Sequence, residues 1–490
     1  MSVPRVQVEL DRSSQPRRVR ISRARYGLPA ALALAVAAAF AAVGCSPDRQ
    51  QAGNGGAKRP HPNVLLVVMD TTRADRLGCY GSTRGLTPGI DALAASGVRF
   101  EHAYAHAPWT LPSTASLLTS RLPSAHGAGG RIGRFTPLSP RVATLAEQFR
   151  SGGYRTAAII NVMFLSERFG LTRGFEHVDY FKGATNEHMR PAGDTTDAAI
   201  AWLTAHRDRP FFALVHYFDP HLVYAPPRAF RERYADPRDR APAAPLFGKR
   251  RDMVKLRQGK INVDQLPIDR LQKLYNAEVA YVDHELTRLI GGLKTAGLSD
   301  NTIVVLTADH GEEFLDHGGY EHGHTLYDEL IHVPLIFTGR DVPANVAAPD
   351  VVGLMDVAPT LLHLAGLPPC SSFHGRLLTP AFEGVTLADR AVLSEGNMWR
   401  TSWFALRQGP LKLIIIPSRE KTRALLFDMA ADPSESNDIA ARDRALTRRL
   451  VSDLEVMLKA ASSTTATQPL DLSDAERDRL CALGYVACTP

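Results

Sequence analysis

The sequence predicts an α/β protein in which helices flank a mostly parallel sheet, followed by a small C-terminal α+β part with an antiparallel sheet. Apolar, β-branched runs of strand length cover residues 63–69, 154–160, 211–216 and 302–307. Such continuous runs fit strands that are buried on both faces of a parallel sheet. Helical patterns lie between them, at 87–96, 141–151, 195–205 and 271–296. This alternation is typical of a doubly wound sheet.

The sequence pattern changes after about residue 380. Short strand-like pieces separated by turns cover 391–394, 402–407, 411–416 and 424–428, and an amphipathic helix covers 441–460. Residues 225–262 are rich in proline and arginine, and we expect an irregular surface insertion there. A chain of 490 residues is long enough for one large and one smaller domain. We therefore place the larger domain at 63–370 and a C-terminal subdomain at 371–490.

The N-terminus has the pattern of an export signal. Basic residues precede an apolar run from Leu28 to Val43, which ends in Gly44-Cys45-Ser46. This order is typical of a signal peptide over residues 1–45, and its end resembles a bacterial lipobox with Cys45 as the lipidated residue. Residues 46–62 are polar and glycine-rich, as in a flexible tether. We expect export to the bacterial cell envelope with a lipid anchor in the membrane; the alternative is an uncleaved membrane anchor.

The net charge of +6 comes mostly from the first 28 residues, where seven arginines against Glu9 and Asp11 contribute +5. The remainder is close to neutral, so the basic isoelectric point does not indicate a nucleic-acid surface. The sequence also has no Walker loop, CxxC pair or basic-aromatic patch. These patterns exclude a nucleotide cofactor and a nucleic-acid partner from our interpretation.

Two acidic residues follow predicted strands directly. Asp70 ends the first run, and Asp309 with His310 follows the last. In an open α/β sheet, ligands bind beyond the carboxyl ends of the strands. Carboxylate oxygens and an imidazole nitrogen at that edge are ligands for a divalent metal ion. The alternative for a single aspartate at this place is a helix cap.

A hydroxyl group stands at the start of another predicted helix. Thr110 precedes Pro112 and a helical run that reaches Ser120. Free backbone N–H groups and the helix dipole make this position suitable for binding a phosphate or sulfate group and for stabilising an alkoxide. Taken alone, a threonine at this position is more often a plain helix cap.

In combination, these segments resemble the sulfatase family of the alkaline phosphatase superfamily. The resemblance rests on Asp70-Thr-Thr-Arg73-Ala-Asp75, on Thr110-Leu-Pro-Ser-Thr-Ala-Ser, on Asp309-His310-Gly311-Glu312 and on the Leu483-Gly484-Tyr485 ending. It covers nearly everything after residue 62. It implies the sulfatase-like sheet with a C-terminal subdomain, and metal-dependent hydrolysis of anionic esters.

The chain departs from the family at the nucleophile. Family members carry Cys or Ser, later oxidised to formylglycine, where this chain has Thr110, and Thr114 replaces the following Arg. Threonine cannot form that aldehyde. The site is instead similar to that of lipoteichoic acid synthases and phosphoethanolamine transferases, in which an acid, a nucleophilic threonine and an Asp-His pair hold one metal ion. The resemblance implies Asp70, Thr110, Asp309 and His310 as ligands of one divalent ion (Ca, Mn or Zn), with Thr110 as the metal-activated nucleophile.

Three histidines are candidates for the general acid, and the sequence does not choose among them. The resemblance places His221 at the family's Asp-Pro-His position, where it also implies substrate contact, while His322 and His324 bracket the place of a family lysine. Arg73 is a candidate for substrate binding; the alternative is an ion pair with Asp75. We interpret His216 as strand packing or as support for the site.

These features leave three functions open. The first is hydrolysis of a sulfated or phosphorylated glycan, lipid or small molecule through a covalent intermediate on Thr110. The second is transfer of a phospho group to an alcohol. The third is a surface-anchored binding protein whose catalytic site has decayed.

Overall fold

The computed structural model describes residues 61–181, 190–235, 267–399, 402–461, 467–482 and 485–486. The predicted signal peptide, Cys45 and nearly all of the predicted tether lie outside these residues. Within the described ranges, every helix is too short or too polar to span a bilayer.

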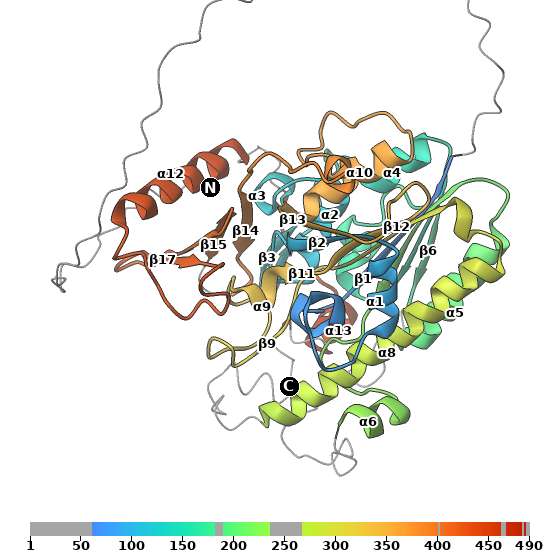
Figure 1. The fold of residues 1–490 in the computed structure, drawn as a ribbon, viewed down its shortest axis with the longest axis horizontal. Coiled ribbons are helices and arrows are strands. Elements are labelled where there is room, and N and C mark those ends of the chain that lie inside the picture. The colour runs from blue at the N-terminus through green and yellow to red at the C-terminus, as the bar shows by residue number, and fades with distance from the viewer. Residues whose placement is uncertain are drawn as a thin grey trace, which may run out of the picture. The chain divides into compact units, whose positions relative to one another are not determined.

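A nine-stranded, mostly parallel sheet forms the centre of the fold (Figure 1). Its strand order is β11-β2-β12-β8-β1-β7-β5-β6, and β13 pairs with β2. The strands are β1 (Asn63–Met69), β2 (Gly97–Tyr104), β5 (Arg155–Ile160), β6 (His177–Tyr180), β7 (Phe211–Tyr217), β8 (Thr302–Ala308), β11 (His332–Val333), β12 (Leu335–Gly339) and β13 (Val346–Gly353). β1 runs parallel to both of its neighbours, β7 and β8, and is buried along its whole length. The predicted fold class and the four predicted apolar strands are therefore confirmed.

The side chains of β1 alternate between two cores, as the period of a strand requires. Leu65, Val67 and Met69 pack into the core beneath α1 (Pro88–Ala95), α5 (Ala192–Ala205) and α8 (Ile268–Thr295). Val64, Leu66 and Val68 pack into the opposite core, which includes α2 (Thr110–Thr119), α4 (Leu145–Ser151) and α10 (Val357–Leu364). Figure 1 shows α5 and α8 side by side on one side of the sheet, with α4 and α10 on the other.

Two predicted boundaries differ from the structure for local reasons. α4 begins at Leu145 rather than at residue 141, because Thr144 and Glu147 form a reciprocal capping box that fixes the start of the helix. The stretch expected to be an irregular insertion contains a short helix, α6 (Arg228–Tyr234), which packs on α8; residues 236–266 lie outside the described part.

The C-terminal part contains the predicted antiparallel sheet. Its strands are β14 (Val392–Gly396), β15 (Trp403–Gln408), β16 (Leu411–Ile416) and β17 (Arg423–Asp428), paired in chain order. Helix α12 (Arg444–Ala461) buries Leu450 and Leu454 in one apolar cluster with Leu406 and Leu413 of this sheet. The domain division at residue 370 stays a prediction.

The chain end returns to the large sheet. After α13 (Asp474–Ala482), Tyr485 and Val486 belong to the same apolar core as β1 and α2. The remaining elements are α3 (Pro123–His126), the hairpins β3 (Gly129–Arg131) with β4 (Arg134–Thr136) and β9 (Glu313–Phe314) with β10 (Tyr320–Glu321), α9 (Asp328–Ile331) and α11 (Thr379–Phe382).

Candidate active site and metal centre

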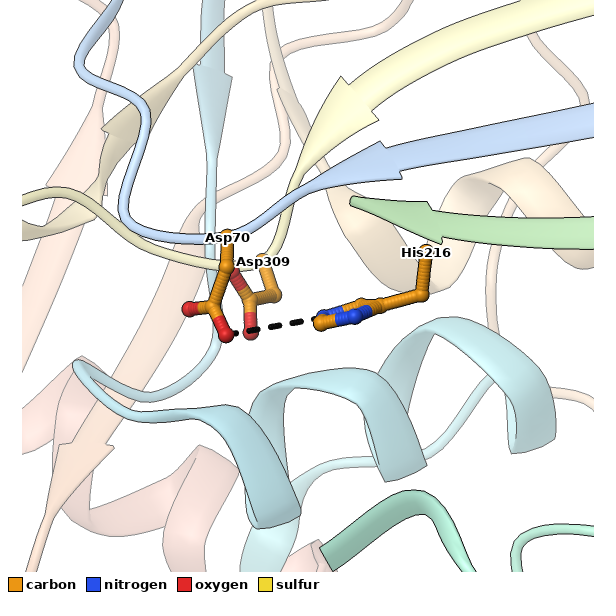
Figure 2. A group of neighbouring side chains, drawn as sticks. All are labelled: Asp70, His216 and Asp309. Carbon is orange, nitrogen blue, oxygen red and sulfur yellow. Dashed lines mark ion pairs between the residues drawn. The ribbon is translucent and has the colours of Figure 1, made fainter. Parts of the chain in front are cut away.

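Three ligand-type side chains meet at the carboxyl ends of three adjacent strands. Asp70 follows β1, Asp309 follows β8, and His216 is the penultimate residue of β7. Figure 2 shows them pointing toward one another. One ligand atom from each lies within 4.8 Å of the others, and His216 Nε2 is 3.6 Å from Asp70 Oδ2. The parallel register explains the meeting, because β7, β1 and β8 end at the same edge of the sheet.

The polar atoms of this triad are buried but not satisfied. Both oxygens of Asp70, Oδ2 of Asp309 and both ring nitrogens of His216 have no hydrogen-bond partner among the described residues. Buried polar groups in native proteins are normally paired, since leaving one unpaired costs free energy. A divalent cation would satisfy such a set of carboxylates and an imidazole. Asp70, His216 and Asp309 thus form a candidate metal-binding triad.

The protonation preferences of the triad fit the same interpretation. Burial raises the pKa of Asp70 well above its usual range, and the charges of Asp309 and Glu312 raise it further. Burial also raises the pKa of Asp309, although His310 opposes this effect. For His216, burial lowers the pKa to about 3, which keeps the imidazole neutral, as a metal ligand must be. Two buried acids that repel each other need a compensating positive charge.

Thr110 and His310 lie in the same cluster. His310 Nε2 is 3.5 Å from Asp70 Oδ1, 3.6 Å from Asp309 Oδ2 and 3.3 Å from the hydroxyl of Thr110. His310 Nδ1 donates to the carbonyl of Gly311, which leaves Nε2 as the nitrogen with a free lone pair. All four residues predicted to hold the ion are therefore brought together, and their shared coordination stays a prediction.

Helix α2 holds Thr110 at this place. Thr110 is the first residue of the helix and follows the extended Trp109. Ser113, in the same first turn, donates its hydroxyl proton to the carbonyl of Asp309 and so ties α2 to the end of β8. Thr114 stands where the family carries arginine, and its buried hydroxyl has no partner in the described part of the chain. The start of α2 is thus fixed beside Asp309.

Of the three histidine candidates, His322 lies beside His310, and His221 lies beside His322. The rings of His310 and His322 have centroids 4.5 Å apart, and His221 is 5.0 Å from His322. His322 Nδ1 is 2.9 Å from Glu312, which also accepts a hydrogen bond from the hydroxyl of Tyr224.

His324 is half-buried, and its Nε2 lies 2.7 Å from Glu313. This contact holds its ring at the β9–β10 hairpin. The geometry favours His221 or His322 over His324 for a role next to His310.

The guanidinium of Arg73 donates all of its hydrogen bonds to groups within the chain. Five hydrogen bonds of 2.8–3.1 Å lead from its guanidinium to Asp75, Asp316 and the carbonyl of Glu312. A guanidinium has five N–H donors, so this arrangement leaves none for a substrate anion. The contacts favour the alternative interpretation, in which Arg73 fixes the loop after β1.

The sequence interpretation missed three participants. His216 was assigned to packing or support, although a lone histidine at the carboxyl end of an apolar strand was a usable signal. Glu312 was visible only as part of the motif around Asp309. Tyr485, whose hydroxyl is 3.1 Å from His322 Nε2 and 3.4 Å from His221 Nε2, is 264 residues away from His221 in the chain, and no local pattern predicts that contact.

Comparison with known proteins agrees with this architecture. The family model described as Sulfatase matches residues 62–367. Arylsulfatase K of Bos taurus is 25% identical over 477 residues, which cover 87% of each chain.

Among solved structures, the phosphonate monoester hydrolase of Agrobacterium radiobacter superposes with a TM-score of 0.66 at 23% identity, covering 84% of this chain and 100% of the other. BT4656, solved in complex with its substrate D-glucosamine-2-N,6-O-disulfate, gives a TM-score of 0.65 at 22% identity, covering 82% and 97%. At these identities the superpositions establish the fold. Together with the family match, which spans more than half of the chain, they show that this protein belongs to the sulfatase family.

Proposed function

We propose that this protein is a metal-dependent hydrolase of sulfate- or phosphate-type esters, in which Thr110 is the nucleophile and forms a covalent intermediate. One observation carries the proposal. The hydroxyl of Thr110 lies at the start of α2, 3.3 Å from His310 Nε2, in the buried cluster that contains the unsatisfied atoms of Asp70 and Asp309. A nucleophile, a candidate metal site and a helix N-terminus thereby share one place.

Asp70, Thr110, Asp309 and His310 would hold the ion, and His216 offers a further nitrogen. Two imidazoles beside two carboxylates favour Mn or Zn over Ca, because calcium prefers oxygen ligands. A bound divalent ion would lower the pKa of the Thr110 hydroxyl and offset negative charge on the ester.

The residues of the chain account for the remaining steps. The Thr110 oxygen attacks the sulfur or phosphorus atom in line, a new ester bond forms on Thr110, and the bond to the leaving oxygen breaks. His322, which lies beside His310, or His221, which lies beside His322, donates a proton to that oxygen. Water then attacks the sulfo- or phospho-threonine, releases sulfate or phosphate and restores the hydroxyl. Free backbone N–H groups at the start of α2 stabilise the anionic group throughout.

Similar proteins suggest the substrate class. An arylsulfatase, a phosphonate monoester hydrolase and a protein bound to a sulfated glucosamine share this fold. We propose an anionic ester on a glycan, a lipid or a small molecule.

Export and anchoring through Cys45 belong to the proposal as well. Loss of fatty-acid labelling in a Cys45→Ala variant would support the anchor, and retained labelling would contradict it.

Replacing the nucleophile tests the proposal. Purified protein is assayed on nitrophenyl sulfate, a phosphate diester and a phosphonate monoester, and the reaction is quenched for intact-mass measurement. Thr110→Ala is expected to lose about 1,000-fold or more of the activity, because the covalent route is removed. Wild-type protein is expected to carry a sulfate- or phosphate-sized adduct that the variant lacks.

A matched control lies on the same helix. Thr119 is also fully buried on α2, and its hydroxyl donates to the carbonyl of Ala115, so Thr119→Ala removes the same atoms away from the site. This variant is expected to retain activity. Activity of Thr110→Ala equal to that of the control, or an adduct on any other residue, would overturn the assignment of the nucleophile.

A further inference from the structure

We propose that Tyr485 is a positioning residue of this active site, and that the end of the chain completes the site by holding His221 and His322 in place. This inference rests on the proposed function, because it assigns those two histidines to the reaction centre. It adds a residue from the C-terminal tail to a site otherwise built at the edge of the large sheet.

The tail delivers Tyr485 in a fixed position. Its side chain is 2% exposed, and its ring packs edge-on against Phe164 with centroids 4.6 Å apart. The backbone N–H of Tyr485 donates to the carbonyl of Leu480, a residue of α13 that is itself completely buried. The carbonyl of Tyr485 accepts from the N–H of Gly133, in the turn between β3 and β4. Ring and backbone are thus held from three separate parts of the chain.

The hydroxyl of Tyr485 closes a chain of hydrogen bonds. Tyr224 donates to Glu312, which pairs with Nδ1 of His322 at 2.9 Å. His322 Nε2 is 3.1 Å from the Tyr485 hydroxyl, which is 3.4 Å from Nε2 of His221. His221 in turn pairs through Nδ1 with the carbonyl of Leu222 at 2.6 Å. The Nε2 atoms of the two imidazoles therefore share Tyr485 as a partner.

The chemistry of these contacts explains why a hydroxyl is suited to the place. Both Nδ1 atoms face acceptors, a carboxylate and a carbonyl, so both carry hydrogen. The two Nε2 atoms then share one partner between them. A phenol hydroxyl can donate to Nε2 of a neutral ring and can also accept from Nε2–H of a ring that carries a second proton, whereas an amide carbonyl only accepts and an ammonium group only donates.

Orientation of the two rings matters for the reaction because the general acid is a ring with a proton on Nε2, and that N–H must turn from the Tyr485 hydroxyl to the leaving oxygen. Without the hydroxyl, each imidazole would lose its contact at Nε2, and its ring would be held less firmly. Removal of such an outer partner typically costs about 10- to 100-fold in activity. A poor leaving group depends more on protonation than a good one does. The loss of activity should therefore be larger on esters with poor leaving groups than on esters with good ones.

The test compares Tyr485→Phe with wild type on two esters, one with a phenyl and one with a dinitrophenyl leaving group. Both are esters of the acid, sulfate, phosphate or phosphonate, on which the wild-type protein is most active. We expect kcat on the phenyl ester to fall about 10- to 100-fold, with a much smaller fall on the dinitrophenyl ester and little change in KM. Tyr154→Phe is the matched control, since Tyr154 is 1% exposed, its hydroxyl donates to the carbonyl of Ala365, and it precedes β5 at the opposite edge of the sheet. A loss of folding alone would lower both esters equally.

A second readout does not require turnover. Modification of histidines by diethyl pyrocarbonate, mapped by peptide mass, is expected to rise several-fold at His221 and His322 in Tyr485→Ala and to stay unchanged in Tyr154→Ala. Equal rates on both esters for Tyr485→Phe and wild type, or unchanged labelling, would overturn the role of Tyr485 and leave the proposed function standing. A wild-type protein inactive on every ester would sink the proposed function, while the labelling would still decide whether Tyr485 holds these rings.

Discussion

Removal of the metal ion should have an effect on stability that can be worked out from the site. An ion that binds the folded chain at about 1,000 times its Kd adds about 4.1 kcal/mol to the free energy of unfolding. A folded part of roughly 380 residues has an entropy of unfolding of roughly 0.8 kcal/mol/K near its midpoint. We therefore expect saturating Mn or Zn to raise the Tm of EDTA-treated protein by about 5 °C.

The size of this shift should depend on pH in a defined direction. Burial raises the pKa values of Asp70 and Asp309 in the metal-free folded chain above their unfolded values. The folded state then binds more protons than the unfolded state, so the stability of the metal-free protein falls as pH rises through this window. A cation binds the deprotonated carboxylates and removes that penalty. The metal-induced increase in Tm should thus be larger at about pH 8 than at about pH 5.

Differential scanning calorimetry with and without metal at both pH values measures the effect. Asp70→Asn is the control variant, because it keeps the size of the side chain and removes one buried charge. Its metal-free form should melt higher than metal-free wild type near neutral pH, and its response to metal should be lost. Identical melting of EDTA-treated and metal-loaded wild type at both pH values would show that no ion binds at this cluster.

Two further substitutions test individual contacts. His216→Asn should weaken metal affinity about 10- to 100-fold, measured by calorimetric titration of EDTA-treated protein, because it removes the neutral imidazole of the triad; unchanged affinity would restrict His216 to packing. Lys412→Met should lower the free energy of unfolding in urea by about 3–5 kcal/mol, because it leaves the buried Glu435 and the partly buried Asp328, 2.8 and 2.6 Å from the ammonium group, without their cation. Adding Asp328→Asn and Glu435→Gln should recover part of that loss, and no recovery would contradict the electrostatic explanation.

Local patterns were sufficient for the strands that carry the carboxylates. β1 spans the predicted residues 63–69, because an uninterrupted apolar run admits few alternatives to a strand buried on both faces. Asp70 and Asp309 could be placed at one sheet edge because both follow such runs. β2 was not predicted as a strand, because Arg99 and Glu101 interrupt its apolar pattern. This strand lies toward the end of the sheet where it pairs with β11 and β13.

The sequence does not predict which strands are neighbours in the sheet. Periodicity indicates that 211–216 forms a strand, but it does not indicate that this strand lies next to β1, with His216 paired to Val68. The assignment of His216 required that neighbour relationship. The same holds for Tyr485, whose place depends on how α13 returns the chain end to the large core.

The charge of the site bears on the ionisation of Thr110. The residue after Asp70 is Thr71, a neutral side chain whose hydroxyl donates to the carbonyl of Pro220 at 3.1 Å. Two of the candidate ligands, Asp70 and Asp309, are carboxylates whose charge would balance that of a divalent ion, while the nearby Glu312 pairs with His322. A third carboxylate would compete with an alkoxide for that positive charge, whereas neutral imidazoles do not. Under the proposed function, a neutral residue at position 71 suits a nucleophilic hydroxyl at position 110, because a weaker negative field makes the ionised form of Thr110 accessible near neutral pH.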